Sequence, residues 1–169
     1  GDLTANSISL VGWTAATYEI NLTLAALNVG AVLNEVKTGT DAAAGDAVIE
    51  LITGTTDLNS LTADNTIVLV VNHSGNIASS SALEDALEMG GVTALWTKNA
   101  WQAGDAFLAA YDDGVSSYLA RVTIGDATAT DAWFSQGSLT AVTFVKFTGI
   151  AAVTTVIGTG TGVTTIDLI

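Results

Sequence analysis

Short runs of β-branched and aromatic residues, separated by Gly, Asn and Asp, are the feature that most limits how this chain can fold. Branched side chains pack well on a pleated surface, and the separating residues favour tight turns. We expect eight strands, at 7–12, 18–24, 47–52, 66–71, 106–111, 118–124, 142–148 and 163–168. The pattern predicts a mainly β fold, either an antiparallel β-sandwich or a β-roll, with one or two short helices.

The clearest hairpin joins 106–111 to 118–124 through a turn at Asp112-Asp113-Gly114. Glycine suits this turn because it adopts a positive φ without a steric penalty. Side chains alternate between the faces of a strand, so every second residue from Tyr118 to Ile124 shares one face. The opposite face, which we expect to be the more solvated one, carries Leu119, Arg121 and Thr123.

One helix is predicted near 81–89, because Ser81 and Glu84 have the spacing of a capping box. Gly90-Gly91 would then end the helix in the left-handed conformation, and Glu88 would lie on its solvated face. A second helix over 24–36 is a weaker prediction, since Gly30 and several β-branched residues lower its helix propensity.

The composition indicates a folded chain, with 49% hydrophobic and 12% charged residues among 169. We expect a single β-rich domain over 1–169, with a sub-boundary near 60–65 as the alternative. Proline is absent and Lys plus Arg number only four, so few residues can protect exposed strand edges from other strands. The Gly- and Thr-rich end is the expected added or swapped strand, with Val163, Ile166, Leu168 and Ile169 as assembly residues.

The charge balance argues against several partners. Seventeen acidic against four basic residues give a net charge of -13, which disfavours binding to nucleic acid and to anionic membrane surfaces. No apolar run is long enough to predict insertion into a bilayer. The absence of cysteine excludes disulfides and thiolate sites, and the scarcity of Lys and Arg beside abundant Thr, Ser, Ala and Gly favours an exported protein.

Catalytic machinery is not evident in the sequence. His73 is the only histidine, and it follows a predicted strand in a turn, so it has no partners for a hydrolytic triad or a zinc site. Two acidic pairs have the residue types of a glycosidase, Glu84 with Glu88 and Asp112 with Asp113. Helix capping, a solvated helix face and turn chemistry explain them more simply. We therefore predict that the protein is not an enzyme.

Two kinds of ligand remain compatible with the residues. Calcium prefers carboxylate and carbonyl oxygens, and Asp112 and Asp113 are its best candidate ligands, with Asp105 or Asp126 as further donors. No cofactor is required. Exposed indoles can stack on sugar rings, but core packing is the favoured role for the four tryptophans because most other apolar residues are small. These are Trp13, Trp96, Trp101 and Trp133.

The region from Gly104 to Ile150, with the helical segment before it and the apolar finish at 166–169, resembles the C-terminal regions of large bacterial proteins exported by type I secretion. These include RTX-type surface proteins and S-layer proteins with calcium-dependent repeats. The resemblance implies a C-terminal secretion signal, folding outside the cell and a role in coats, fibres or adhesion. The Gly-Gly-x-Gly-x-Asp repeats that bind calcium in that family are absent here.

These observations together predict an extracellular or cell-surface structural subunit, or a surface-anchoring module. Its expected partners are copies of itself, assembled through exposed strand edges into a layer or filament. A carbohydrate-binding module or adhesin domain, with surface polysaccharide as its partner, is the alternative function.

Overall fold

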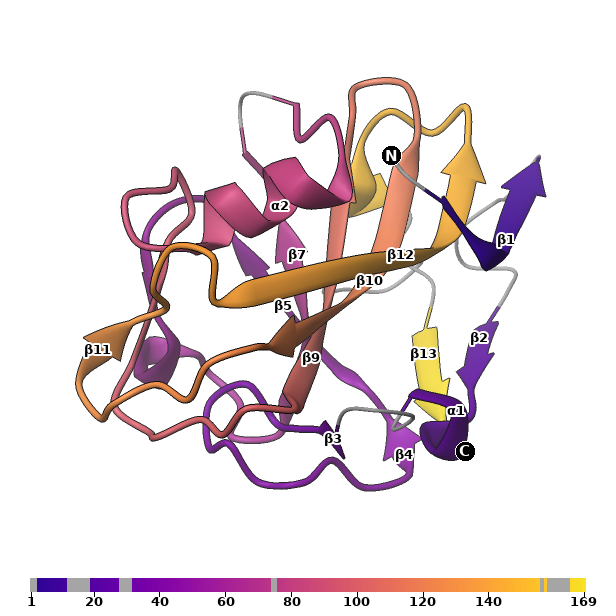
Figure 1. Ribbon diagram of the computed structural model, residues 1–169. Coiled ribbons are helices and arrows are strands. Elements are labelled where there is room, and N and C mark those ends of the chain that lie inside the picture. Colours follow the sequence, from indigo (N-terminus) through magenta and orange to yellow (C-terminus); the bar gives the residue numbers. More distant parts are fainter. Residues whose placement is uncertain (1–2, 12–18, 28–31, 74–75, 156, 158–164) are drawn as a thin grey trace.

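The computed structural model describes residues 3–11, 19–27, 32–73, 76–155, 157 and 165–169 (Figure 1). Its main sheet has the strand order β1-β12-β10-β9-β7-β5, and β3 pairs with β9 off this path. These strands are β1 (Leu3–Val11), β3 (Val32–Leu33), β5 (Val48–Ile52), β7 (Thr66–Val71), β9 (Asp105–Asp112), β10 (Ser117–Ile124) and β12 (Leu139–Thr148). Each of the eight predicted strands overlaps an observed strand within the described residues, so the mainly β fold is confirmed.

The main sheet is mixed, so the prediction of a purely antiparallel arrangement is wrong. Only β10 runs antiparallel to its neighbours, β9 and β12. The pairs β1/β12, β3/β9, β5/β7 and β7/β9 are all parallel. All six residues of β7 are buried, which is typical of a parallel strand covered on both faces and differs from the alternation of a half-solvated strand.

Two small sheets and several short helical segments complete the fold. One sheet joins β6 (Thr56–Asp57), β8 (Leu95–Thr97) and β11 (Ala132–Trp133), and the other joins β2 (Glu19–Leu22), β4 (Gly45–Asp46) and β13 (Thr165–Leu168). The helices are α1 (Leu24–Leu27) and α2 (Ser80–Leu87), with 3₁₀ turns η1 (Leu58–Ser60) and η2 (Val153–Thr155). None of the helices in the described residues is long and apolar enough to cross a membrane.

Hydrophobic clusters cover both faces of the main sheet. Tyr118 and Val122 of β10 belong to the cluster that contains α2, whereas Leu119 belongs to the cluster that contains β2 and β13. The predicted alternation of β10 is therefore confirmed, and Arg121 on the second face is only half-buried. In Figure 1, α2 lies against the face of the sheet that β12 and β10 form.

The predicted helix near 81–89 is observed as α2, but the prediction of Ser81 as its N-terminal cap is wrong. Ser79, with an extended backbone, accepts the hydrogen bond from the amide of Ala82 at 3.1 Å, so the helix begins one residue earlier than predicted. The helix ends at Leu87 with Glu88 as an extended C-cap, so Gly90, which has a φ of 91°, lies beyond the end of the helix and is not the predicted stop. Of the predicted helix over 24–36, Leu24–Leu27 is helical as α1, but the prediction is wrong at Val32 and Leu33, which form β3 beside β9.

Candidate assembly interface

Strand β1 forms an open border of the main sheet. Among the described residues it pairs only with β12, and Figure 1 shows it at the rim of the molecule. Its nine residues include no charged side chain and no proline. Ile8 and Val11 are 59% and 80% exposed. A long, uncharged strand with unpaired backbone groups is a template for pairing with another strand.

The first half of β12, which β1 does not reach, is instead covered by two carboxylates of α2. Glu84 accepts a hydrogen bond from the amide of Ala141 at 2.6 Å. Glu88, which is 4% exposed, accepts from the amides of Gly137 at 2.7 Å and Leu139 at 2.8 Å. The predictions of Glu84 as a helix cap and Glu88 as a solvated side chain are therefore wrong. Both side chains act as substitutes for a neighbouring strand.

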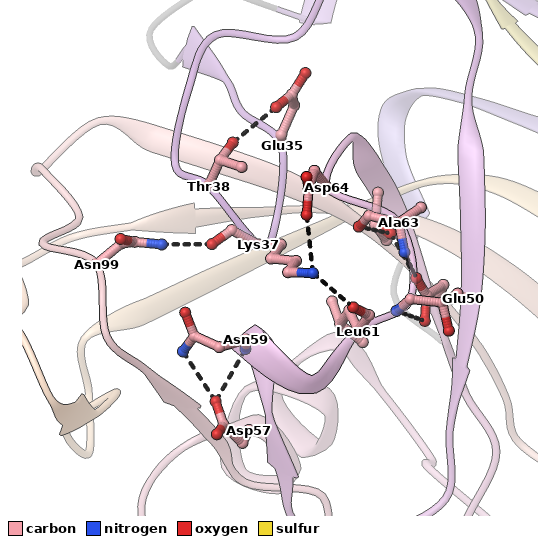
Figure 2. A network of polar contacts seen from close by, with 12 residues as sticks. Glu35, Lys37, Thr38, Glu50, Asp57, Asn59, Leu61, Ala63, Asp64 and Asn99 are labelled. Carbon is pink, nitrogen blue, oxygen red and sulfur yellow. Dashed lines mark hydrogen bonds and ion pairs between the residues drawn. The ribbon is translucent and has the colours of Figure 1, made fainter.

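Strand β5 forms the opposite border, where β7 is its only partner in the described part of the chain. Leu51 is 44% exposed there. Glu50 is the only charged residue of β5, and its carboxylate accepts hydrogen bonds from the amides of Thr62 and Ala63 at 3.0 and 2.7 Å. Figure 2 shows Glu50 directed at this loop. The single charge is thus used within the molecule and does not guard the border.

The loops beside β5 are held in place by a polar network (Figure 2). Lys37 donates to the carbonyl of Leu61 at 2.9 Å and forms an ion pair with Asp64 at 2.8 Å. Asn99 donates to the carbonyl of Lys37, and Asp57 accepts from the amide of Asn59. These contacts join three loops that are distant in sequence, so the surroundings of β5 are built before any partner binds.

The two borders run in the same direction. Strand β10 is antiparallel to both β9 and β12, so β9 and β12 are parallel to each other. The remaining neighbours in the row are paired in parallel, which gives β1 and β5 a common orientation. A β5 strand placed beside the β1 strand of a second copy in the same orientation would therefore form a parallel pair like those already present.

The predicted assembly residues at the C-terminus occupy different environments. Val163 lies outside the described residues. Ile166 and Leu168 are each 1% exposed and belong to the hydrophobic cluster on the β13 face, whereas Ile169 is 60% exposed. Strand β13 pairs with β2 on one side and β4 on the other. Because the backbone of β13 is paired on both sides and the side chains of Ile166 and Leu168 are buried, the open borders of the main sheet are better candidates for assembly.

The predicted calcium ligands are engaged in turn chemistry. Asp113 accepts from the amides of Val115 and Ser116 at 2.8 and 2.7 Å and from the hydroxyl of Tyr118 at 2.5 Å. Asp112 accepts from the amide of Val153 at 3.1 Å. The described residues contain no group of three or more His, Asp or Glu that could hold a metal ion, and neither Asp105 nor Asp126 joins such a group. Asp112 and Asp113 are thus hydrogen-bonded within the chain, and calcium binding at these residues stays a prediction.

The tryptophans divide between core and surface. Trp101 is fully buried and packs edge-on against Phe107 and Phe134, with ring centroids 6.0 and 5.8 Å apart, so the predicted core role is confirmed for it. Trp133 is 37% exposed and Trp96 is half-buried. Trp13 lies outside the described residues. His73 is half-buried in the loop after β7.

A cavity of about 460 Å³ lies between α1 and the main sheet. Its walls are mainly apolar, from residues such as Leu22, Val142 and Phe144, and Arg121 is its charged residue. The guanidinium of Arg121 donates to the carbonyl of Leu27 at 2.7 Å, so it fastens α1 to β10. This contact gives Arg121 a structural role.

Among the described residues, the main sheet is mixed and has two open borders of common direction, β1 and β5. No protein-family model, curated protein or solved structure matches the chain. Ile8, Val11 and Leu51 at the borders were not singled out from the sequence. The absence of charged residues along 3–11 is the sequence feature that could have indicated Ile8 and Val11.

Proposed function

We propose that this protein is an extracellular structural subunit whose copies add to one another through the borders of the main sheet. The observation that supports this proposal is the pair of open borders, β1 and β5, which both present exposed apolar side chains. Strand β1 has no charged residue, and the carboxylate of Glu50 in β5 is hydrogen-bonded within the molecule. Unpaired edges of this kind bind further strands unless lysine, proline or a covering segment protects them. The resemblance to type I secreted surface proteins supports a location outside the cell.

The proposed contact is head-to-tail, with β5 of one copy beside β1 of the next. This contact uses two different surfaces, so it does not close on itself in a pair and instead extends into a filament or layer. The common direction of β1 and β5 supports it, because each added copy repeats the orientation of the one before. The net charge of -13 would limit lateral clumping of such filaments.

The test is to place lysines on β1 in the double variant Ile8→Lys/Val11→Lys. Both side chains are exposed, so the monomer should keep its fold, which circular dichroism would check. We expect the unmodified protein to form assemblies in light scattering and electron microscopy, and the double variant to stay monomeric. Runs with calcium and with a chelator separate border pairing from assembly driven by a metal.

The matched control is Val115→Lys, which adds a charge at another exposed apolar residue, in the turn between β9 and β10. It should assemble like the unmodified protein. A strictly monomeric unmodified protein, or a double variant that assembles normally, would contradict the proposal.

A further inference from the structure

Two hollows lie next to each other around Gly90 and Gly91, just beyond the end of α2. The first has a volume of about 410 Å³, and its walls include Met89, Gly90, Gly91 and Trp133. The second has a volume of about 320 Å³ and shares both glycines, with Asp85 and Gln136 on its far side. Each volume is that of a small-molecule site. The two hollows together form one surface, with the exposed apolar side chains of Met89 and Trp133 in one half and the exposed polar side chains of Asp85 and Gln136 in the other.

Trp133 and Met89 supply the apolar half. They are 37% and 50% exposed, so each presents a large apolar surface to solvent. Trp133 stands directly opposite Trp96 in the β8/β11 ladder, and directly opposed residues project from the same face of a sheet. The indole of Trp133 therefore stands on a short sheet beside the hollow. A flat aromatic surface of this kind suits the apolar C–H face of a sugar ring.

Asp85 and Gln136 supply the polar half. Both residues are exposed, and neither side chain makes a hydrogen bond within the described residues. Glu88 also lines this hollow, but its carboxylate is already used by the amides of Gly137 and Leu139. A carboxylate and a primary amide with unused capacity offer both acceptors and donors to the hydroxyl groups of a ligand.

Backbone hydrogen bonds fix the shape of this surface. The amide of Met89 donates to the carbonyl of Phe134 at 2.8 Å, which ties the end of α2 to β11. The amide of Thr93 donates to the carbonyl of Ala86 at 3.0 Å, and that of Thr56 to the carbonyl of Ala94 at 2.9 Å. The walls are therefore held in place without a ligand, as is usual for binding sites.

We propose that the double hollow binds a neutral pyranose oligosaccharide, with one ring stacked on Trp133 and its hydroxyls bonded to Asp85 and Gln136. The amphipathic character of a sugar ring matches the apolar and polar halves. Acidic sugars would be repelled by Asp85 and by the net charge of -13. This inference goes beyond assembly and does not depend on it, since no residue of β1 or β5 is among those that line the two hollows.

The test is calorimetric titration with neutral hexaoses of glucose, mannose and N-acetylglucosamine, and with an oligogalacturonate as the acidic probe. We expect at least one neutral hexaose to bind and the acidic probe not to bind. Trp133→Ala should weaken binding about tenfold or more, while Trp133→Phe keeps an aromatic surface and loses less. Asp85→Asn should weaken binding without altering the fold.

Val115→Ala serves as the control, because Val115 is an exposed apolar residue in a distant turn. Titrations with the Ile8→Lys/Val11→Lys variant show whether binding needs assembly, so failure of one proposal is distinguishable from failure of the other. Absence of binding to every neutral probe, preference for the acidic probe, or full affinity in Trp133→Ala would overturn the proposal.

Discussion

The carboxylate of Glu88 accepts a hydrogen bond from the amide of Leu139, 2.8 Å away, at the part of β12 that β1 leaves uncovered. Glu84 does the same for Ala141. Helix α2 thus closes the border of β12 with side-chain oxygens, whereas β1 closes the rest of β12 but leaves a new border of its own. The main sheet therefore combines a stretch of β12 that side-chain oxygens protect with open borders at β1 and β5, and assembly is expected at the open borders.

Replacement of Glu88 by Ala should destabilise the protein by about 1–3 kcal/mol, because the buried amide of Leu139 would lose its acceptor. The amide of Gly137 is exposed and can bind water instead, so it adds little. Urea denaturation would measure the loss. Asp85→Ala, at an exposed position of the same helix, should change stability by less than about 0.5 kcal/mol. Equal stability of the two variants would refute the role of Glu88.

The Asp113–Tyr118 contact predicts a pH dependence of stability. Burial pushes the pKa of Asp113 upward, but hydrogen bonds from Tyr118, Ser116 and Val115 outweigh it and hold the pKa below the usual 3.8. A lowered pKa in the folded state stabilises above pH 3.8, and this contribution is lost as the pH falls through the folded value. Tyr118→Phe removes one donor, so we expect its stability to fall less steeply with acidification.

Alkaline pH should act on the same pair in the opposite sense. Burial, together with the Asp113 carboxylate, raises the pKa of Tyr118 above its usual 10.0. Its contribution is therefore present below pH 10.0 and lost as the pH rises further, and Tyr118→Phe should abolish that loss. The control is Tyr111→Phe, which removes a hydroxyl bonded to Thr143 at 2.7 Å and leaves the Asp113 contact intact. The stability of both variants would be measured by denaturation across the acidic and the alkaline range. The same pH dependence for Tyr118→Phe and Tyr111→Phe would contradict this account.

Gly91→Ala should be strongly destabilising. A Cβ atom at Gly91 would lie 2.2 Å from the carbonyl oxygen of Asp85 and 2.4 Å from that of Ala86, and these are backbone atoms that cannot move cheaply. Gly54→Ala is the matched control, because a Cβ there meets nothing within 4 Å and its φ is not positive. We expect a stability gain of up to about 1 kcal/mol for Gly54→Ala. Thermal melting of both variants would show opposite shifts, and a melting temperature for Gly91→Ala as high as that of the unmodified protein would be inconsistent with the close approach.

Leu168→Ala should cost about 2–5 kcal/mol, because its side chain is 1% exposed and its removal leaves a cavity in the cluster beside β13. Ile169→Ala, one residue further and 60% exposed, should be nearly neutral. Chemical denaturation at several protein concentrations would add a second readout. In the Ile8→Lys/Val11→Lys background, which removes the proposed border pairing, a midpoint that rises with concentration would mean that β13 is exchanged between copies, contrary to the contacts within the chain.

Local patterns were sufficient for the eight longest strands and for α2, whereas the two- and three-residue strands β3, β4, β6, β8 and β11 were not predicted. The β-branched run at 66–71 is β7 residue for residue, and the Asp112-Asp113-Gly114 turn joins β9 to β10, with a φ of 81° at Gly114. Branching at Cβ and the freedom of glycine act within a few residues, so they are visible in the sequence. The sequence indicated that strand edges would be open in general, but it did not show that β1 and β5 would be those edges.

The tertiary structure alone decided which strands became borders and what the acidic residues do. Leu3 pairs with Thr143, and Glu88 reaches Leu139, across separations for which the sequence carries no local signal. A run of residues that favours a strand can become a central strand such as β13 or a border strand such as β1, because its position depends on which backbone groups of distant segments remain to be paired. Hydrogen bonding between segments far apart in the chain therefore fixed the border at β1, while local conformational preference fixed only that β1 would be a strand.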